Sequence, residues 1–249
     1  MADTYVCEVS MSDNSSIEWT DASWNPVTGC TKISPGCKNC YAERFAERFR
    51  GVKGHPYEQG FDFKLWPERL SQPSQWRRPR RIFVNSMSDL FLDEVPLSYI
   101  QNVFASMEQA KHHTFQILTK RAKRLNTVAP QLRWPENVWM GVSVENQDYT
   151  WRVDYLRNVP AAVRFLSIEP LLGPVNVNLN GIHWVIVGGE SGPRSRTMEE
   201  TWVRSLQNQC KLADVPFFFK QWGGVQKSRT GRELDGRTWD EYPRELSVR

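Results

Sequence analysis

Six short apolar runs, each with polar residues at its carboxyl end, constrain the fold of this 249-residue chain more than any other feature. The runs are nearly continuous in apolar residues instead of alternating with polar ones. That pattern is typical of strands covered on both faces of a parallel sheet. An earlier strand is expected within 16–30. The six runs lie at 81–87, 114–120, 138–144, 163–169, 184–190 and 216–222.

Stretches with apolar residues at helical spacing separate these runs, and the alternation predicts an α/β fold. The first stretch, 37–51, carries an apolar face and is expected to end at Gly51. The stretch 197–215 opens with Thr197 and Glu200 at the spacing of a capping box. Other helices are expected at 96–113, 122–132 and 148–159. The apolar face of 37–51 consists of Tyr41, Ala42, Phe45, Ala46 and Phe49.

The polar ends of the predicted strands favour an incomplete (β/α) TIM-like barrel of six to seven parallel strands over a doubly wound sheet. In such barrels the carboxyl ends of the strands form the active face. The competing explanation is that strands simply end in polar residues. The polar end residues are Ser86, Asp89, Thr119, Lys120, Ser143, Glu145, Glu169, Glu190, Lys220 and Gln221.

The expected domain organisation is one partial barrel, 17–224, between a flexible N-terminus, 1–16, and a C-terminal extension, 225–249. The segment 51–80 contains several Pro and Gly residues and predicts a long insertion, and such loops are often functional. No apolar run approaches the roughly 18 residues of a membrane span. The first residues also lack the basic start and apolar core of a signal peptide. We therefore expect a cytoplasmic protein without a membrane partner.

Three of the five cysteines, Cys30, Cys37 and Cys40, lie close together with the spacing C-x6-C-x2-C. An odd number of cysteines in a reducing compartment argues against a disulfide framework. Thiolates are soft ligands that suit zinc or iron–sulfur clusters. The triplet therefore predicts a metal site.

A structural zinc ion would require a fourth ligand in addition to the three thiolates. The candidates are His55, Cys7 and Cys210, and none of them lies at a spacing typical of zinc fingers. A [4Fe–4S] cluster held by three thiolates would instead leave one iron open for a small molecule. Both kinds of site remain open at this point.

The cysteine loop and the helix predicted after it resemble the cluster loop of the radical S-adenosylmethionine (SAM) enzymes. The stretch "GCKNCYAERF" is particularly similar to the loop of spore photoproduct lyase and its relatives. From 17 to 222 the chain also resembles a three-cysteine-motif family of phages and bacteria whose function is unsettled. The matching stretches are "EWTDASWNPVTGCTKISPGCKNCYAE", "NSMSDLF", "ILTKR", "GVSVEN", "SIEPLLGP", "VGGESG" and "FFFKQWG".

The resemblance implies that Cys30, Cys37 and Cys40 bind a [4Fe–4S] cluster whose open iron chelates SAM. It also implies reductive cleavage of SAM to a 5′-deoxyadenosyl radical, which abstracts hydrogen from a substrate. Such a reaction requires an electron donor such as a flavodoxin or ferredoxin. Tyr41 would pack beside the cluster or the adenine of SAM.

Two features depart from the pattern of the radical SAM superfamily. The first cysteine gap has six residues instead of the commoner three. The "GGE" motif, which normally follows the second strand and binds the SAM amino group, here ends the run 184–190. The second strand is followed instead by "NSMSDLF", so Ser86, Ser88 and Asp89 are the better candidates for the amino and carboxylate groups of SAM. The alternatives are a helix N-cap for "NSMSDLF" and a tight glycine turn for "VGGESG".

Other polar strand ends are further candidates for contact with the cofactor. Acidic residues often bind nucleotide ribose hydroxyls, and lysine binds carboxylates or phosphates. Ordinary ion pairing across the barrel mouth is the competing explanation. The candidates are Glu145 and Glu169 for the ribose, Lys120 or Lys220 for the methionine carboxylate or a substrate phosphate, and Glu190 at the "GGE" position.

A basic segment with a neighbouring tryptophan suggests a nucleic-acid partner. Arginine neutralises phosphates and aromatic rings stack on bases. A second basic cluster lies at 119–124. The competing explanation is a solvated surface, and the net charge of +4 is only mildly basic. The first segment contains Trp76, Arg77, Arg78, Arg80 and Arg81.

These observations favour a radical-SAM-like iron–sulfur enzyme that modifies or repairs a nucleic acid or nucleotide. The alternative is a nucleic-acid-binding accessory protein, stabilised by zinc or an inert cluster, that does not cleave SAM. A third hypothesis is a barrel hydrolase in which Glu145, Glu169 and Glu190 supply the general acid and base. The third leaves the three cysteines unexplained.

Overall fold

The computed structural model describes residue 15 and residues 17–243 of the chain. The expected flexible N-terminus, 1–16, therefore lies almost wholly outside the described residues. The last six residues of the expected C-terminal extension also lie outside them.

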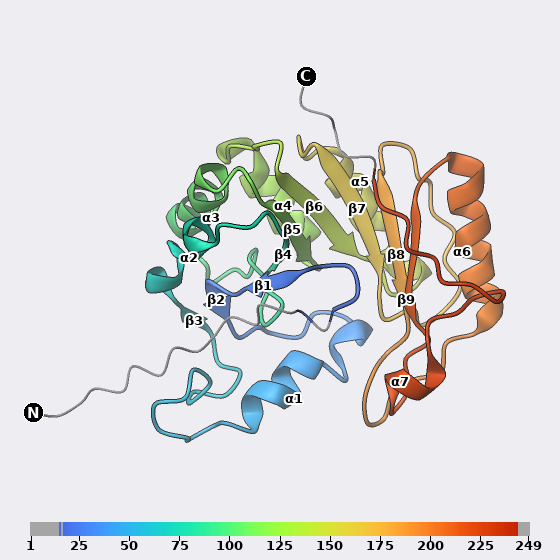
Figure 1. Ribbon diagram of the computed structural model, residues 1–249, viewed down its shortest axis with the longest axis horizontal. Coiled ribbons are helices and arrows are strands. Elements are labelled where there is room, and N and C mark those ends of the chain that lie inside the picture. The colour runs from blue at the N-terminus through green and yellow to red at the C-terminus, as the bar shows by residue number, and fades with distance from the viewer. Residues whose placement is uncertain (1–14, 16, 244–249) are drawn as a thin grey trace, which may run out of the picture.

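Seven parallel strands form one curved sheet, an open half-barrel in the order β1-β4-β5-β6-β7-β8-β9 (Figure 1). Every strand of this sheet pairs with the next one along the chain, and β2 and β3 form a separate antiparallel pair. The expected incomplete barrel of six to seven parallel strands is therefore confirmed. The strands are β1 (Ala22–Trp24), β2 (Val27–Thr28), β3 (Lys64–Leu65), β4 (Arg81–Val84), β5 (Thr114–Thr119), β6 (Val138–Ser143), β7 (Val163–Ile168), β8 (Trp184–Gly188) and β9 (Phe217–Gln221).

The longer helices lie outside the curved sheet, while α1 lies apart from them below it (Figure 1). The helices are α1 (Tyr41–Glu47), α2 (Gln72–Gln75), α3 (Leu97–Gln109), α4 (Ala122–Val128), α5 (Trp151–Arg157), α6 (Glu200–Ala213) and α7 (Lys227–Thr230). Short 3-10 helices occur at Pro35–Cys37, Pro67–Arg69, Ala129–Gln131 and Gln147–Tyr149. Within the described part of the chain, no helix is both long enough and apolar enough to cross a membrane.

The continuous apolar runs are explained by two separate cores, one on each face of the sheet. In β4, Ile82 and Val84 pack with the larger core, which includes the outer helices, whereas Phe83 packs with a smaller aromatic core. The aromatic core also contains Trp139 and Trp184, near the amino ends of β6 and β8. Side chains in a strand alternate between faces, so both neighbours must be apolar when both faces are covered.

Along the same inner face, the positions toward the carboxyl ends of the strands change from aromatic to polar. In three places an aromatic residue of the smaller core is followed two positions later by a polar residue. These polar residues are Asn85 in the segment after β4, Ser167 in β7 and Lys220 in β9. The half-barrel is thus filled with rings at its amino end and lined with polar groups at its carboxyl end. The carboxyl end is therefore the polar end of the half-barrel.

Two local expectations differ from the structure. The helix that begins at Tyr41 ends at Glu47 and not near Gly51, and on its expected apolar face Tyr41 and Phe45 are exposed while only the alanines are buried. The capping box is wrong, because α6 begins at Glu200 and its N-cap makes no side-chain hydrogen bond. The segment 51–80, expected as an insertion, lies before β4 and contains the short elements β3 and α2.

The C-terminal segment 225–243 returns along the edge strand β9. Phe219 N donates to Trp239 O at 2.9 Å, and Trp184 Nε1 donates to Glu241 O at 2.8 Å. The ring of Tyr242 lies 5.1 Å from that of Trp184. The segment therefore covers the unpaired edge of the sheet and closes the aromatic core at its amino end.

Candidate functional site

The three cysteines lie on one loop between β1 and α1, at the carboxyl end of the sheet. Gly29 N donates to Met87 O at 3.0 Å, which ties the loop to the segment after β4. Gly29 has φ +83°, and a Cβ there would lie 2.3 Å from Asp62 O, so the position requires glycine. Cys30, Cys37 and Cys40 are half-buried free thiols.

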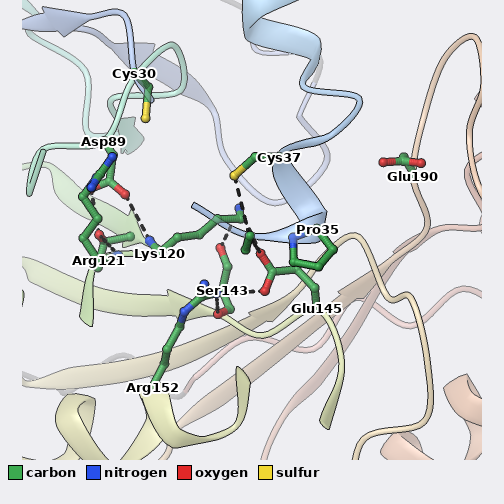
Figure 2. Close-up of polar contacts among 12 residues, drawn as sticks. Cys30, Pro35, Cys37, Asp89, Lys120, Arg121, Ser143, Glu145, Arg152 and Glu190 are labelled. Carbon is green, nitrogen blue, oxygen red and sulfur yellow. Dashed lines mark hydrogen bonds and ion pairs between the residues drawn. The ribbon is translucent and has the colours of Figure 1, made fainter. Parts of the chain in front are cut away.

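The buried carboxylate of Glu145 supports this loop from the sheet side. Ser34 Oγ donates to Glu145 Oε1 at 2.5 Å and lies 3.6 Å from Cys37 Sγ. Glu145 Oε2 accepts from Arg152 Nη1 at 2.8 Å, and both side chains are almost fully buried. Lys120 Nζ lies 4.0 Å from Glu145 Oε1. In Figure 2, Cys37 lies above Glu145, Arg152 approaches from below, and the side chain of Lys120 extends toward them.

A second buried carboxylate, Glu190, holds the loop from another direction. Asn39 Nδ2 and Arg196 Nε each donate to Glu190 Oε2 at 2.9 Å. Arg196 Nη2 also donates to Pro35 O at 3.0 Å, so Arg196 joins Glu190 to the cysteine loop. Burial raises the pKa of Glu190, but the hydrogen bonds from Arg196 and Asn39 outweigh it and hold the pKa below its ordinary value. Glu190 is therefore ionised at neutral pH.

Burial is the main influence on the pKa of the thiols at both ends of the triplet, Cys30 and Cys40. Arg121 Nη2 donates to Thr31 Oγ1 at 2.6 Å and so anchors the start of the loop. Burial, reinforced by the charge of Asp89, raises the pKa of Cys30 to about 12, against the opposing effect of Arg121. Burial also raises the pKa of Cys40. Both thiols are protonated in the metal-free chain, so metal binding would release protons.

Three thiols are a donor type that suits both a zinc ion and an iron–sulfur cluster. No three His, Cys, Asp or Glu side chains between residues 17 and 243 are grouped closely enough to hold one metal ion. Zinc gathers four donors around one centre at about 2.0–2.3 Å, whereas a cluster distributes its thiolates over separate irons. Of the candidate fourth ligands, His55 stacks on Phe49 at 3.9 Å and Cys210 is buried on α6. Cys7 lies outside the described residues.

The residues expected to bind the amino and carboxylate groups of SAM already make internal hydrogen bonds. Asp89 is buried, and its carboxylate accepts three hydrogen bonds from the chain, one of them 2.7 Å from Thr119 Oγ1. The hydroxyls of Ser86 and Ser88 donate to oxygen atoms of residues 25–27. These three residues organise the loops around the site, and their contact with SAM stays a prediction.

Other expected cofactor residues remain partly open to a ligand. Tyr41 Oη donates to Ser86 O at 2.6 Å while the side chain stays 52% exposed. Lys220 Nζ donates to Glu169 Oε1 at 2.5 Å, and both side chains are partly exposed. Lys120 is half-buried and donates to a serine hydroxyl of β6. Lys120, Glu169 and Lys220 lie at or just beyond the carboxyl ends of β5, β7 and β9, whereas Tyr41 opens α1.

The carboxylates proposed for a hydrolase are each paired with a cation of their own. A general acid must hold a proton at working pH, whereas hydrogen bonds from Arg196 and Asn39 hold the pKa of Glu190 below its ordinary value. All three carboxylates are engaged in ion pairs, and the hydrolase hypothesis still leaves the three cysteines unexplained. The pairs are Glu145 with Arg152, Glu169 with Lys220, and Glu190 with Arg196.

The basic segment 76–81 lies at the other end of the sheet. Arg81 opens β4 and pairs with Asp21, just before β1, at 3.1 Å. Arg77 and Arg78 are exposed. A groove of about 1030 Å³ also opens at this amino end, beside β7–β9 and α6. The structure therefore does not bring this segment or this groove to the cysteines, whereas the second basic cluster supplies Lys120 and Arg121 to the site.

Sequence reasoning missed the residues that hold the loop in place. Ser34, Asn39, Arg152 and Arg196 contact the loop or the two buried carboxylates. They lie in a loop, at a turn or on a helix, and no local pattern distinguishes them from solvated polar residues. Only the folding of β6, β8 and the cysteine loop into one place shows their role.

Comparison with known proteins gives one family and one group of structures. A family model described as "Protein of unknown function (DUF5131)" matches residues 14–243. No curated protein matches the chain. Spore photoproduct lyase complexed with dinucleoside spore photoproduct is similar in fold, with a TM-score of 0.53 at 10% identity over 82% of this chain and 64% of that one.

A cysteine-to-alanine mutant of spore photoproduct lyase with dinucleoside spore photoproduct gives a TM-score of 0.52 at 11% identity, over 82% of this chain and 64% of that one. A double mutant with bound AdoMet and the same dinucleoside gives 0.50 at 12% identity, over 82% and 57%. This chain thus spans 57% to 64% of the length of these structures. At such identities the similarity concerns the fold alone, an open half-barrel of parallel strands.

Proposed function

This chain belongs to the family described as protein of unknown function DUF5131, and within that family we propose that it acts as a radical-SAM-like iron–sulfur enzyme on a nucleic acid or nucleotide. One observation carries the proposal. Three free, half-buried thiols share one loop at the polar end of a parallel half-barrel. We also propose that the three-cysteine motif defines this family. The catalytic unit would be 17–224.

Cys30, Cys37 and Cys40 would hold a [4Fe–4S] cluster. Such a cluster would supply the electron for reductive cleavage of bound SAM, the chemistry that precedes hydrogen abstraction from a substrate. The chain would hold the cysteine loop in place through two buried carboxylates. Glu145 positions it through Ser34, and Glu190 through Asn39 and Arg196.

Residues at the mouth of the half-barrel would orient SAM and the substrate. Lys120 is placed to pair with a carboxylate or phosphate, and Tyr41 presents an exposed ring beside Cys40. The pair of Glu169 and Lys220 offers an acceptor for ribose hydroxyls and a donor for an anion. The aromatic core beneath them excludes water from the amino end of the half-barrel.

The substrate class rests on the similar structures and on charge. Structures of spore photoproduct lyase hold AdoMet and a dinucleoside photoproduct. Basic side chains follow β5 at the mouth of the site, where they would favour an anionic substrate. An electron donor such as a flavodoxin or ferredoxin would complete the system.

Anaerobic reconstitution tests the proposal directly. We expect about four irons and four sulfides per chain, a shift of the electron paramagnetic resonance signal when SAM is added, and 5′-deoxyadenosine after reduction. Cys30→Ala should lower the iron content strongly. A colourless protein that carries zinc after anaerobic purification would instead support the accessory-protein alternative.

A further inference from the structure

Exposed apolar side chains are concentrated on and after the cysteine loop. Eight large hydrophobic residues are exposed in the described part of the chain, and five of them fall between residues 33 and 63. Scattered exposed apolar residues need no explanation, but a concentrated group indicates an interaction surface. The five are Ile33, Tyr41, Phe45, Val52 and Phe63.

Helix α1 presents two of these rings side by side. Ala42 and Ala46 are buried against Met87, which leaves Tyr41 and Phe45, one turn apart, on an open stripe of the helix. Figure 1 shows α1 and the loop after it extending from the half-barrel instead of packing among the outer helices. We call Tyr41 and Phe45 the α1 stripe.

The rings of the α1 stripe are fixed although they are exposed. The hydroxyl of Tyr41 is bound to Ser86 O at 2.6 Å. Phe45 rests against Phe49 and Tyr57, with ring centroids 5.2 Å and 5.7 Å away. A ring that is already immobilised loses little conformational entropy when a partner stacks on it.

The charges around the stripe are predominantly basic once internal pairs are taken into account. Glu43 pairs with Lys32, while Glu47 and Asp62 both pair with Arg50. Three exposed basic residues of 38–53 make no ion pair with any residue the structure describes, namely Lys38, Arg48 and Lys53. Fixed rings flanked by unpaired cations match a polyanion that carries flat apolar groups, which is the chemistry of single-stranded nucleic acid.

We propose that the α1 stripe, together with Lys38 and Arg48, binds a single-stranded nucleic-acid segment and delivers it to the mouth at Cys40. This inference rests on the proposed function, because the bound strand is taken to be the substrate of the proposed enzyme. It assigns substrate binding to α1 and not to 76–81, because α1 begins next to a cysteine of the triplet while Arg81 opens β4 at the amino end.

Fluorescence anisotropy with a labelled 12-nucleotide single-stranded DNA tests this inference on the full chain, with and without the reconstituted cluster. Phe45→Leu keeps an apolar side chain but removes the stacking face, and we expect it to weaken binding about tenfold.

Lys38→Gln with Arg48→Gln should reduce the slope of log K against log salt by about 1.4, because each phosphate contact to a single strand contributes about 0.7. Arg77→Gln with Arg78→Gln is the matched charge control and should leave affinity within about twofold of wild type at matched salt.

Several results would overturn the inference. Absence of oligonucleotide binding at low salt would do so, as would equal losses in the two charge variants. A concentration-dependent dimer abolished by Phe45→Leu would assign the stripe to a second copy of the chain, and cluster-dependent binding of a flavodoxin through Phe45 would assign it to an electron donor. Circular dichroism checks the folding of each variant. Iron content and 5′-deoxyadenosine report separately on the proposed function, so either idea can fail alone.

Discussion

At the scale of single residues, the pair of Glu145 and Arg152 lies almost completely out of solvent. A buried ion pair adds little net stability over well-packed apolar residues, but removing one partner leaves an uncompensated charge. The pair is therefore best understood as a positioning device, since Glu145 receives the hydrogen bond from Ser34 in the cysteine loop.

Changing Arg152 alone should be costly for stability. Arg152→Met leaves Glu145 buried without its closest cation, and we expect the free energy of unfolding to fall by about 3–5 kcal/mol. Adding Glu145→Gln to Arg152→Met removes the unpaired charge and should restore at least half of the loss. Urea denaturation of both variants measures the loss and its recovery. A single-variant loss below about 1 kcal/mol would contradict the assignment, because it would mean that water or Lys120 compensates the charge.

Glu190 predicts a pH dependence of stability. Its pKa in the folded chain lies below the ordinary value of 4.5, so the ionised form is favoured by folding. The stabilisation is fully present above pH 4.5 and is lost as the pH falls through the lowered pKa. The difference in unfolding free energy between wild type and Glu190→Gln should thus be constant from pH 7 to pH 5 and shrink at lower pH. A difference that grew on acidification would show that the pKa is raised instead.

At the scale of elements, the cysteine loop packs so closely on the sheet that one of its glycines admits no side chain. A Cβ on Gly36 would lie 2.5 Å from Glu145 Cγ and 2.6 Å from Oε1. Glu145 is fully buried and bound by Arg152, so it has little freedom to move away. The loop would have to shift instead.

Gly36→Ala should therefore lower the iron content after reconstitution by more than half, with a smaller effect on the melting temperature. Gly173→Ala is the matched control, because a Cβ there meets only ordinary contact at 3.6 Å from Asn146. Iron analysis and thermal melting of both variants check the prediction. Equal iron content in the two variants would show that the loop does not need this close approach.

At the scale of the whole molecule, the aromatic core determines how the half-barrel is closed at its amino end. Trp184 lies at the centre, with Trp19, Phe165 and Phe218 within 6.3 Å between ring centroids. Its indole also holds the returning C-terminal segment through Glu241 O. The side chain of Trp184, a residue of the sheet, thus contacts both Trp19 near the start of the described chain and Glu241 near its end.

Trp184→Ala should reduce the free energy of unfolding by about 3–5 kcal/mol, because it leaves a large cavity in this core. Leu212→Ala serves as the control, since Leu212 is 89% exposed and its change should stay within about 0.5 kcal/mol. Guanidinium denaturation measures both. A small effect of Trp184→Ala would mean that the core collapses around the vacancy.

The parallel half-barrel and its strand positions could be predicted because a strand buried on both faces leaves a continuous apolar run. The predicted strands extend one to three residues past the observed ones, since the run cannot show where the chain leaves the sheet. The roles of Glu145 and Glu190 were harder to predict. Their positions after β6 and β8 were evident, but their partners Arg152 and Arg196 pair with them only in the folded chain.

The basic segment 76–81 shows the same limit at a larger scale. Its composition indicated nucleic-acid contact, yet composition does not show which end of a parallel sheet a segment occupies. Helical spacing placed Tyr41 and Phe45 on one apolar face with Ala42 and Ala46, and the structure leaves the two rings exposed. The reason is that α1 packs through its two alanines, so its larger rings have no core to enter.

The sequence by itself determined that apolar runs form a covered parallel sheet and that three thiols lie on one loop after the first strand. Both are local properties, fixed by side-chain periodicity and by short spacing along the chain. Only the tertiary structure decided which carboxylates are paired, where the cysteine loop rests and which aromatic rings stay open to solvent. Those outcomes depend on contacts between residues up to 161 positions apart, and desolvation and packing across such distances leave no periodic signal in the chain.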